Sequence, residues 1–214
     1  MPSYQLLSLD IWDTILRRDC HPDAIKVETA AVLLERHGGE LQETYRNPRA
    51  LFRLRQDIER QLGATKKAQG FDDEYAIQDV FRELLARAYR EPLPEAAAEE
   101  LASRLVAEEL AAEKRHVYLD PGIVAEIDSI PHERLVCISD FYADEAFLRE
   151  LLTAAGFSKP LERVLVSCDF GVNKRSGRLF EEAEKLLNVT PAAHMHLGDN
   201  AYSDVEVPKR LGIA

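Results

Sequence analysis

Polar side chains able to do chemistry follow four short apolar runs of this sequence. They are Asp10 and Asp13 after the first run, Ser139 and Asp140 at the end of the second, Lys174 after the third, and Asp199 and Asp204 after the fourth. Two or three carboxylates can hold Mg²⁺ through their oxygens, and a further carboxylate oxygen can attack phosphorus as a nucleophile. A lysine and a hydroxyl can hold the phosphoryl oxygens while charge redistributes. If the four runs end at one place, the set indicates metal-assisted phosphoryl chemistry.

The apolar runs that must position these residues have the length and composition of β-strands. Strands are expected over 4–9, 134–138, 163–166 and 194–197, with a fifth beginning at 211–213, and helices over 144–155 and 177–187. Alternation of strand, polar loop and helix is typical of an α/β fold with a parallel sheet. Ligands bind at the carboxyl ends of the strands in such sheets. The sequence therefore predicts that the polar residues meet at one edge of the sheet.

The stretch 20–118 has a different pattern, with helices and no strand. Helices are expected from 23 to 38, over 48–62, over 73–90 and over 95–115. The predicted organisation is a core made of 1–19 and 119–214, interrupted by a helical domain at 20–118. Four arginines, Arg46, Arg49, Arg53 and Arg60, are expected on one face of the second helix. They form either a solvated face or a surface that recognises an anionic substrate.

Composition excludes several classes of function. The chain has 214 residues, 30% of them charged, and a formal net charge of −11, which argues against general binding of nucleic acid or anionic membranes. No run approaches the ~18 apolar residues of a membrane span, and the first residues lack the pattern of a signal peptide. Three scattered cysteines indicate reduced thiols in a cytoplasmic protein. His194 and His196 alternate on the fourth run, which predicts that one of them faces the core in a structural role.

In this order, the motifs resemble those of the haloacid dehalogenase superfamily, most of whose members are phosphatases. The segment 10–14 is similar to the first motif, Ser139 to the second, Lys174 to the third and 198–204 to the fourth. The resemblance covers about 1–16 and 120–214. It implies a Rossmann-like core, with the first strand central in a parallel sheet and a helical cap inserted between strands one and two. Such a cap is expected to exclude water and select the substrate.

The resemblance also implies a role for each residue. Asp10 is expected to be the nucleophile and a magnesium ligand, and the backbone carbonyl of Trp12 to face the same metal. Asp199 is the expected second carboxylate ligand, supported by Asp204 directly or through water. Ser139 and Lys174 are expected to hold the phosphoryl group. Contacts to a small phosphorylated substrate are expected from four neighbouring residues, Trp12, Thr14, Arg17 and Asp140.

One position departs from the family pattern. Phosphatases of this superfamily carry a general acid two residues after the nucleophile, where this chain has Trp12, and the nearest carboxylate is Asp13. General acid–base catalysis contributes about 10²–10⁴-fold in rate. The departure implies a slow phosphatase, a substrate with a good leaving group, or a non-hydrolytic metal-binding module. The dehalogenases also have an aromatic residue there, but that branch needs no magnesium, whereas Asp199 and Asp204 indicate a metal.

A subgroup of predicted hydrolases in this superfamily has a closer resemblance. It shares the segment 10–18, followed by Cys20 and Pro22, and the segment 139–142. Its members often occur with glycosyltransferases of bacterial surface-polysaccharide synthesis. The resemblance implies a sugar phosphate as substrate and a fused or associated glycosyltransferase as partner. Because family cores usually continue past the fourth motif, we expect the chain to be the N-terminal domain of a larger protein.

Overall fold

The computed structural model describes residues 4–214, which divide into two compact units. The first unit combines the chain up to Arg18 with Val117–Ala214, and the second is Asp19–His116. The sequence placed the helical insertion at 20–118, within two residues of these limits. None of the helices in the described part of the chain combines the length and apolar character needed to cross a membrane.

The first unit contains all the strands among the described residues. They are β1 (Tyr4–Leu9), β2 (Leu16–Arg18), β3 (Val117–Leu119), β4 (His132–Ser139), β5 (Arg163–Val166) and β6 (His194–Leu197). Its helical segments are α5 (Ile123–Ser129), α6 (Glu145–Ala154), α7 (Ser167–Phe170), α8 (Arg178–Leu187), η2 (Pro191–Ala193), the π-helical η3 (Ala201–Glu206) and α9 (Val207–Leu211).

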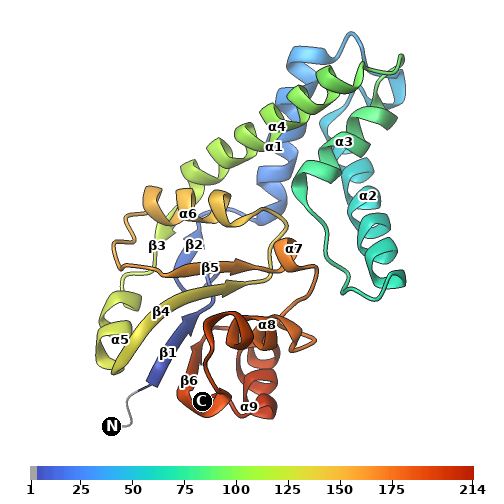
Figure 1. Cartoon of the computed structure of the whole chain (residues 1–214). Coiled ribbons are helices and arrows are strands. Elements are labelled where there is room, and N and C mark those ends of the chain that lie inside the picture. Colours follow the sequence, from blue (N-terminus) through green and yellow to red (C-terminus); the bar gives the residue numbers. More distant parts are fainter. Residues whose placement is uncertain (1–3) are drawn as a thin grey trace. The chain divides into compact units, whose positions relative to one another are not determined.

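Four of these strands form a parallel sheet in the order β5-β4-β1-β6 (Figure 1). The first strand is interior, and its residues from Leu6 onward are buried on both faces, as is usual in parallel sheets. This confirms the predicted α/β fold. The expected fifth strand at 211–213 is wrong in its bounds, because Leu211 still ends α9. Only Ala214 bonds to β6, with its N–H on the carbonyl of His194 at 3.0 Å.

Helices cover both faces of this sheet. In Figure 1, α6 lies on one side, and α8 and α9 lie on the other. On the latter side, Leu6, Val136 and Ile138 from the sheet share one buried cluster with Leu179 and Phe180 of α8. Helix α8 also buries Ala183 and Leu187, so its apolar positions recur every three or four residues and form one stripe. The stripe fixes α8 against the sheet face that carries the even-numbered residues of β1.

A small second sheet supports the segment after β1. The antiparallel pair β2 and β3 joins Leu16 to Leu119, and Trp12 forms an isolated bridge with Leu16. Between them, the Asp13 N–H donates to the carbonyl of Leu16 at 2.8 Å, and Asp13 has a positive φ of 59°. Asp tolerates this left-handed conformation better than most residues. The chain therefore turns sharply just after Asp10.

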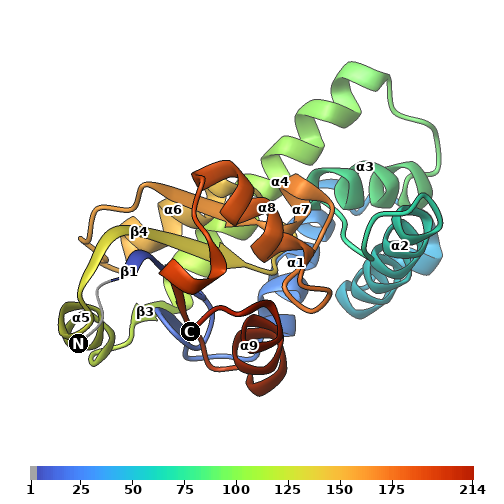
Figure 2. The ribbon, with the colours of Figure 1, turned by 60° about the horizontal axis from the view of Figure 1, so that its bottom comes forward.

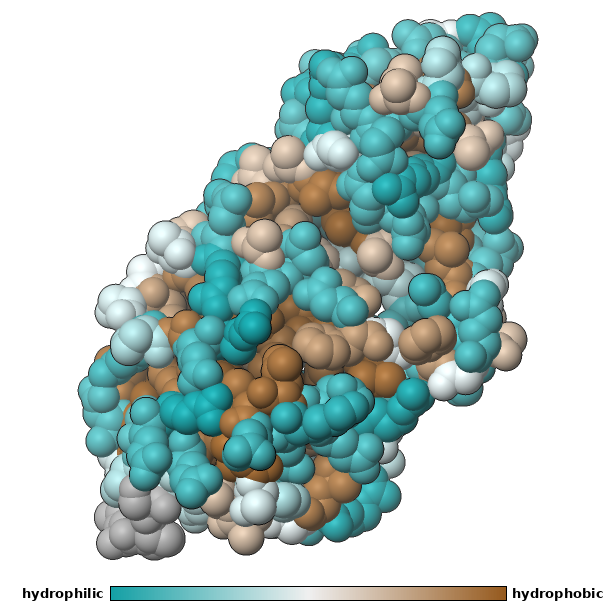
Figure 3. All heavy atoms as spheres, in the orientation of Figure 1, coloured by the Kyte–Doolittle hydropathy of each residue, from teal (hydrophilic) through white to brown (hydrophobic). Residues whose placement is uncertain are grey.

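The second unit is a bundle of four helices, α1 (Pro22–His37), α2 (Pro48–Ala68), α3 (Ile77–Ala88) and α4 (Glu95–His116), with the short turn η1 (Glu43–Tyr45). Each helix packs against two of the others, α1 against α2 and α4, and α3 likewise (Figure 2). Hydrophilic residues cover most of the surface of this unit that Figure 3 shows. Pro48 starts α2, with the Asn47 side chain accepting the Arg49 N–H at 2.8 Å.

Two expectations for the second helix of this unit are wrong. Helix α2 runs to Ala68 rather than 62, because Gly63 continues the helix where the backbone of Asp73 packs against it. Arg46 is not on α2 at all, since it precedes Pro48 and donates to the carbonyl of Leu41 at 3.2 Å. The four predicted arginines therefore do not form one helix face.

Candidate active site and metal centre

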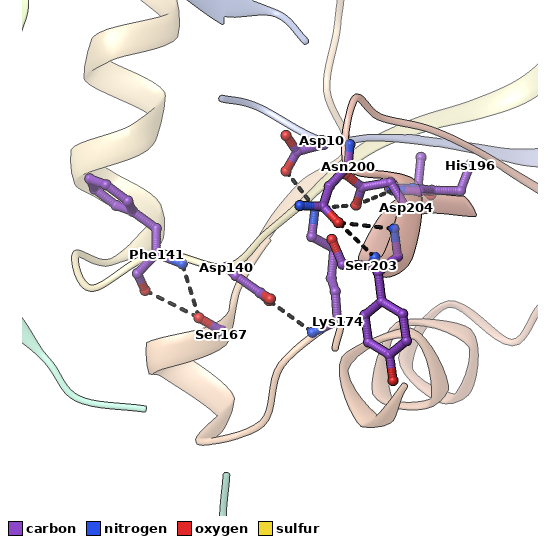
Figure 4. A network of polar contacts seen from close by, with 11 residues as sticks. Asp10, Asp140, Phe141, Ser167, Lys174, His196, Asn200, Ser203 and Asp204 are labelled. Carbon is purple, nitrogen blue, oxygen red and sulfur yellow. Dashed lines mark hydrogen bonds and ion pairs between the residues drawn. The ribbon is translucent and has the colours of Figure 1, made fainter. Parts of the chain in front are cut away.

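The carboxyl edge of the parallel sheet brings together three of the predicted residues. Asp10 follows β1, Lys174 lies in the loop after α7, and Asp204 lies in η3 after β6 (Figure 4). The Lys174 Nζ donates to Asp10 Oδ1 at 2.5 Å and to Asp204 Oδ1 at 2.6 Å. All three side chains are buried. The neighbouring Arg175, in contrast, is exposed.

Three carboxylates could hold a cation here. Asp10, Asp199 and Asp204 each offer an oxygen, and these oxygens lie within 4.8 Å of one another. Asp10 and Asp204 are buried, whereas Asp199 is exposed. Hard oxygen donors of this kind suit Mg²⁺, which usually binds one or two carboxylates and keeps several waters. The donor set fits the ion that the sequence predicted.

The Asp204 carboxylate is held from three sides. Its Oδ2 accepts the backbone N–H of Asn200 at 3.0 Å, and its Oδ1 lies 3.2 Å from His196 Nε2. A Cβ atom added at Gly198 would come within 2.5 Å of the Asp204 Cγ. The Asn200 side chain in turn accepts the N–H groups of Tyr202 and Ser203 at 3.0 Å, which starts η3. The π-helical turn and Gly198 therefore make the space for this carboxylate.

The pKa values of the ionisable side chains in the site differ from their usual values. Burial raises the pKa of Asp10 to about 6, although Lys174 partly opposes the shift. Burial alone would lower the pKa of Lys174, but Asp10 and Asp204 outweigh it and raise that pKa. Burial opposes ionisation of Asp204, yet the hydrogen bond from His196 and the charge of Lys174 hold its pKa below the usual range. One ammonium thus faces several carboxylates, an excess of negative charge that favours a cation.

The end of β4 provides a hydroxyl and a second carboxylate. Ser139 is the last residue of the strand and is buried, and its Oγ has no hydrogen-bond partner among the described residues. The Ser139 hydroxyl therefore does not cap a helix among the described residues. Asp140 Oδ1 accepts the backbone N–H of Lys174 at 2.8 Å, which fixes the loop that carries the lysine. Burial raises the pKa of Asp140.

Trp12 lies among aromatic and cationic groups. The guanidinium carbon of Arg18 lies 3.4 Å from the centre of its indole ring, a cation–π contact, and the Phe141 ring centre lies 5.1 Å away. The indole N–H is buried without a hydrogen-bond partner among the described residues. Trp12 is therefore a packed ring at the position where the resemblance led us to expect a general acid. Its carbonyl as a metal ligand stays a prediction.

Three further predicted residues line a cleft of about 230 Å³ beside Asp199. Asp13, Thr14 and Arg17 line it together with Asp199 and Asp120. Arg17 Nε donates to Asp120 Oδ2 at 2.6 Å. Partial burial raises the pKa of Asp199, and the negative charge of Asp13 adds to the shift. Asp13 is exposed and lines the same cleft as Asp199, the exposed one of the three carboxylates.

The sequence did not identify two residues that hold parts of the site in place, Ser167 and His196. Ser167 Oγ accepts the N–H of Phe141 at 3.0 Å and fixes the loop after β4. His196 contacts Asp204, and the expectation that only one of His194 and His196 faces the core is wrong. Residues two apart on a strand share a face, and both are buried. Burial lowers the pKa of His194 to about 3 and that of His196 to about 4.

A comparison with curated proteins finds a relative whose name describes an enzymatic activity. The chain is 30% identical over 152 residues to the phosphoserine phosphatase of Thermus thermophilus, a match that covers 71% of this chain and 60% of that protein. The match thus spans less than two thirds of the relative's length. No family model matches the chain.

Solved structures share the fold over almost the whole chain. The 2-haloacid dehalogenase of Pseudomonas syringae superposes with a TM-score of 0.68 at 18% identity, covering 98% of this chain and 84% of that one. The HAD-hydrolase YfnB of Bacillus subtilis, described as bound to magnesium, gives a TM-score of 0.57 at 17% identity, covering 99% and 87%. At these identities the comparisons show the fold, which is that of the haloacid dehalogenase superfamily.

Proposed function

We propose that this chain is a magnesium-dependent phosphohydrolase that acts on a small phosphorylated metabolite through a phosphorylated Asp10. The observation that carries the proposal is the grouping of Asp10, Asp199 and Asp204 within reach of one cation, with Lys174 bonded to two of them. The phosphatase named among the relatives supports phosphoryl transfer.

The residues suit a two-step reaction. An Asp10 oxygen attacks phosphorus, and the bond from phosphorus to the leaving oxygen breaks. Water then attacks the phosphorus of the aspartyl phosphate, which releases inorganic phosphate and restores the Asp10 carboxylate. Lys174 and the free hydroxyl of Ser139 are donors for phosphoryl oxygens as their charge changes. A bound Mg²⁺ supplies charge neutralisation between the anionic nucleophile and the anionic substrate.

Trp12 limits the substrates that such a site can hydrolyse fast. An alkoxide leaving group needs a proton from an acid as the bond to phosphorus breaks, whereas the more stable aryloxide of an aryl phosphate leaves without one. Asp13 is the nearest carboxylate in sequence, and its exposed position on the cleft beside Asp199 supports it as a replacement acid. We therefore expect a high ratio of aryl to alkyl phosphate turnover, and a further fall in alkyl turnover in Asp13→Asn.

The test is release of phosphate from 4-nitrophenyl phosphate with and without Mg²⁺. Asp10→Asn should lower the rate by about 10⁴-fold or more, as removal of a nucleophile does in other enzymes. Asp57→Asn, the same change at an exposed position of α2, is the matched control. Absence of any Mg²⁺-dependent and Asp10-dependent turnover would rule out the proposed function.

Two other functions follow from Trp12. A non-hydrolytic metal-binding module would bind Mg²⁺ without any turnover. A 2-haloacid dehalogenase would release halide from a 2-haloacid in the absence of Mg²⁺, and the shared fold alone does not favour it. The sugar-phosphate substrate and the glycosyltransferase partner stay predictions. Screening of sugar phosphates and co-purification from the source cell test them.

A further inference from the structure

A continuous chain of polar side chains runs through the core behind the carboxylate site. From α8, Glu184 Oε1 lies 3.1 Å from His194 Nδ1, and His194 Nε2 lies 2.7 Å from Ser8 Oγ. Ser8 Oγ lies 2.7 Å from His196 Nδ1, and His196 Nε2 lies 3.2 Å from Asp204 Oδ1. We call these five residues the core relay. Its last member, Asp204, is one of the three carboxylates that could hold a cation. Figure 4 shows His196 beside Asp204.

The core relay lies in an apolar environment. Ser8 and His194 are completely buried and His196 nearly so. The Phe180 ring stands edge-on to the His196 ring with 4.8 Å between centres. Burial of polar groups costs free energy unless each finds a hydrogen-bond partner, and an aliphatic side chain would fill the same space without that requirement. Packing alone therefore does not explain two imidazoles and a hydroxyl at these positions.

The order of donors along the core relay follows from its end. The Asp204 carboxylate accepts, so His196 carries its proton on Nε2. The Nδ1 of a neutral His196 then accepts the Ser8 O–H, and the Ser8 oxygen accepts Nε2–H of His194. His194 Nδ1 is left as an acceptor that faces Glu184, whose carboxyl group can donate when protonated. All the hydrogen bonds of the core relay therefore donate in the same direction, from Glu184 toward Asp204.

We propose that His196 is a positioning residue that holds the Asp204 carboxylate in place for the cation. Ser8 and His194 set the orientation and the tautomer of the His196 ring. The proposal rests on the proposed function only in taking the cation to be Mg²⁺. The register of the sheet makes the arrangement possible, because Ser8 pairs with His196 across β1 and β6. Residues behind metal ligands commonly act in this way, and their replacement lowers metal affinity by about 10–100-fold.

The first measurement concerns the tautomer and needs no metal. Long-range ¹H–¹⁵N correlation spectra distinguish the two neutral forms of histidine, and His196→Gln assigns the signal. We expect His196 and His194 to be neutral with the proton on Nε2. A proton on Nδ1 of His196 would overturn the proposal, since that nitrogen faces Ser8 and Nε2 could not donate to Asp204.

The second measurement is the Mg²⁺ dissociation constant by calorimetry or Trp12 fluorescence. His196→Gln keeps a donor near the Nε2 position, whereas His196→Asn keeps a polar group only near Nδ1. We expect His196→Asn to raise the dissociation constant about 10–100-fold, and His196→Gln to remain closer to wild type. His132→Asn is the control, because His132 begins β4, at the opposite end of the strand from Ser139, and its Nδ1 lies 2.7 Å from the Ile130 carbonyl oxygen.

The outcomes separate the two proposals. Thermal melting in a chelator identifies a variant that does not fold, and in that case the tautomer decides. Equal Mg²⁺ affinity in folded His196→Asn and wild type would overturn the positioning role and leave the proposed function intact. A wild-type protein that binds no Mg²⁺ would contradict the proposed function and overturn the positioning role with it.

Discussion

Gly198 follows β6 directly, and the absence of a side chain there leaves the space that the Asp204 carboxylate occupies. A Cβ atom would lie 2.5–2.6 Å from the Cγ, Cβ and Oδ2 atoms of Asp204, so one of the two residues would have to shift. We expect Gly198→Ala to weaken Mg²⁺ binding and to destabilise the protein by about 1–3 kcal/mol, the usual cost of overpacking.

The measurement is Mg²⁺ titration together with urea unfolding. Gly39→Ala is the matched control, because no atom lies within 4 Å of a Cβ at that position and its φ is not positive. Mg²⁺ affinity of Gly198→Ala equal to that of the control would show that Asp204 does not need this space.

At the scale of single residues, the sequence predicts the ends of the strands well. Asp10, Lys174 and Asp204 were recognisable because each follows an apolar run, and in a parallel sheet such residues share an edge. The environment of Trp12 was not predictable, since its contact with Arg18 depends on a turn at Asp13 with a positive φ. The residues around Asp13 give no sequence pattern that predicts a turn with a positive φ at this position.

At the scale of elements, α8 and β6 meet through Glu184. Burial raises the pKa of its carboxyl group to about 7, from 4.5 in the unfolded chain, and the nearby Glu181 adds to the shift. Between these values the folded state binds more protons. The contribution of Glu184 to the free energy of unfolding is therefore full below pH 4.5 and is lost as the pH rises through about 7.

Glu184→Gln mimics the protonated carboxyl group at every pH. We expect the variant to match wild type near pH 4.5 and to be more stable by about 1–2 kcal/mol near pH 8, after allowance for solvent screening. Urea unfolding across this pH range measures the difference. Glu182→Gln, at a half-exposed position of the same helix, is the matched control. A constant difference between Glu184→Gln and wild type would mean that Glu184 does not titrate this way.

The helical unit is held partly by a buried ion pair between α2 and α4. Arg55 is 2% exposed and Glu109 fully buried, and Arg55 Nη2 donates to Glu109 Oε1 at 2.8 Å while its Nε donates to Glu59. Removal of Glu109 takes away the buried carboxylate to which both Arg55 Nη atoms donate, and leaves much of a buried guanidinium without its acceptor. We expect Glu109→Leu to lower the free energy of unfolding by about 3–5 kcal/mol.

The control is Glu100→Leu on the same helix, which removes the exposed partner of Arg104. Its effect should stay within about 1 kcal/mol, as for surface pairs in general. Similar losses in the two variants under chemical denaturation would refute a special role for the buried pair.

The strands of the parallel sheet were predictable, whereas the two three-residue strands were not. The strands at 163–166 and 194–197 match β5 and β6, because each is a short β-like run that ends in a polar cluster. The three-residue strands β2 and β3 were missed, since β2 contains two arginines and the pair forms only through long-range register. The core relay was hidden for the same reason, because the pairing of Ser8 with His196 joins residues far apart in the chain.

At the scale of the whole molecule, the acidic residues behind the net charge of −11 differ in their roles. Most acidic residues are solvated, but Asp10, Asp199 and Asp204 gather at one edge of the core sheet with Lys174 between two of them. The division into two units follows the change in sequence pattern, because strands occur only outside Asp19–His116 in the described part of the chain. This grouping of carboxylates is the basis of the cation site that we propose on the first unit.

The most direct measurement is chemical trapping of phosphorylated Asp10 during turnover of 4-nitrophenyl phosphate. Borohydride reduces an acyl phosphate and converts that aspartate to homoserine, which mass spectrometry locates. We expect homoserine at position 10 only when both Mg²⁺ and substrate are present, and none in Asp10→Asn. Phosphate release that continues without any modification at Asp10, or with the label on another residue, would show that Asp10 is not the nucleophile.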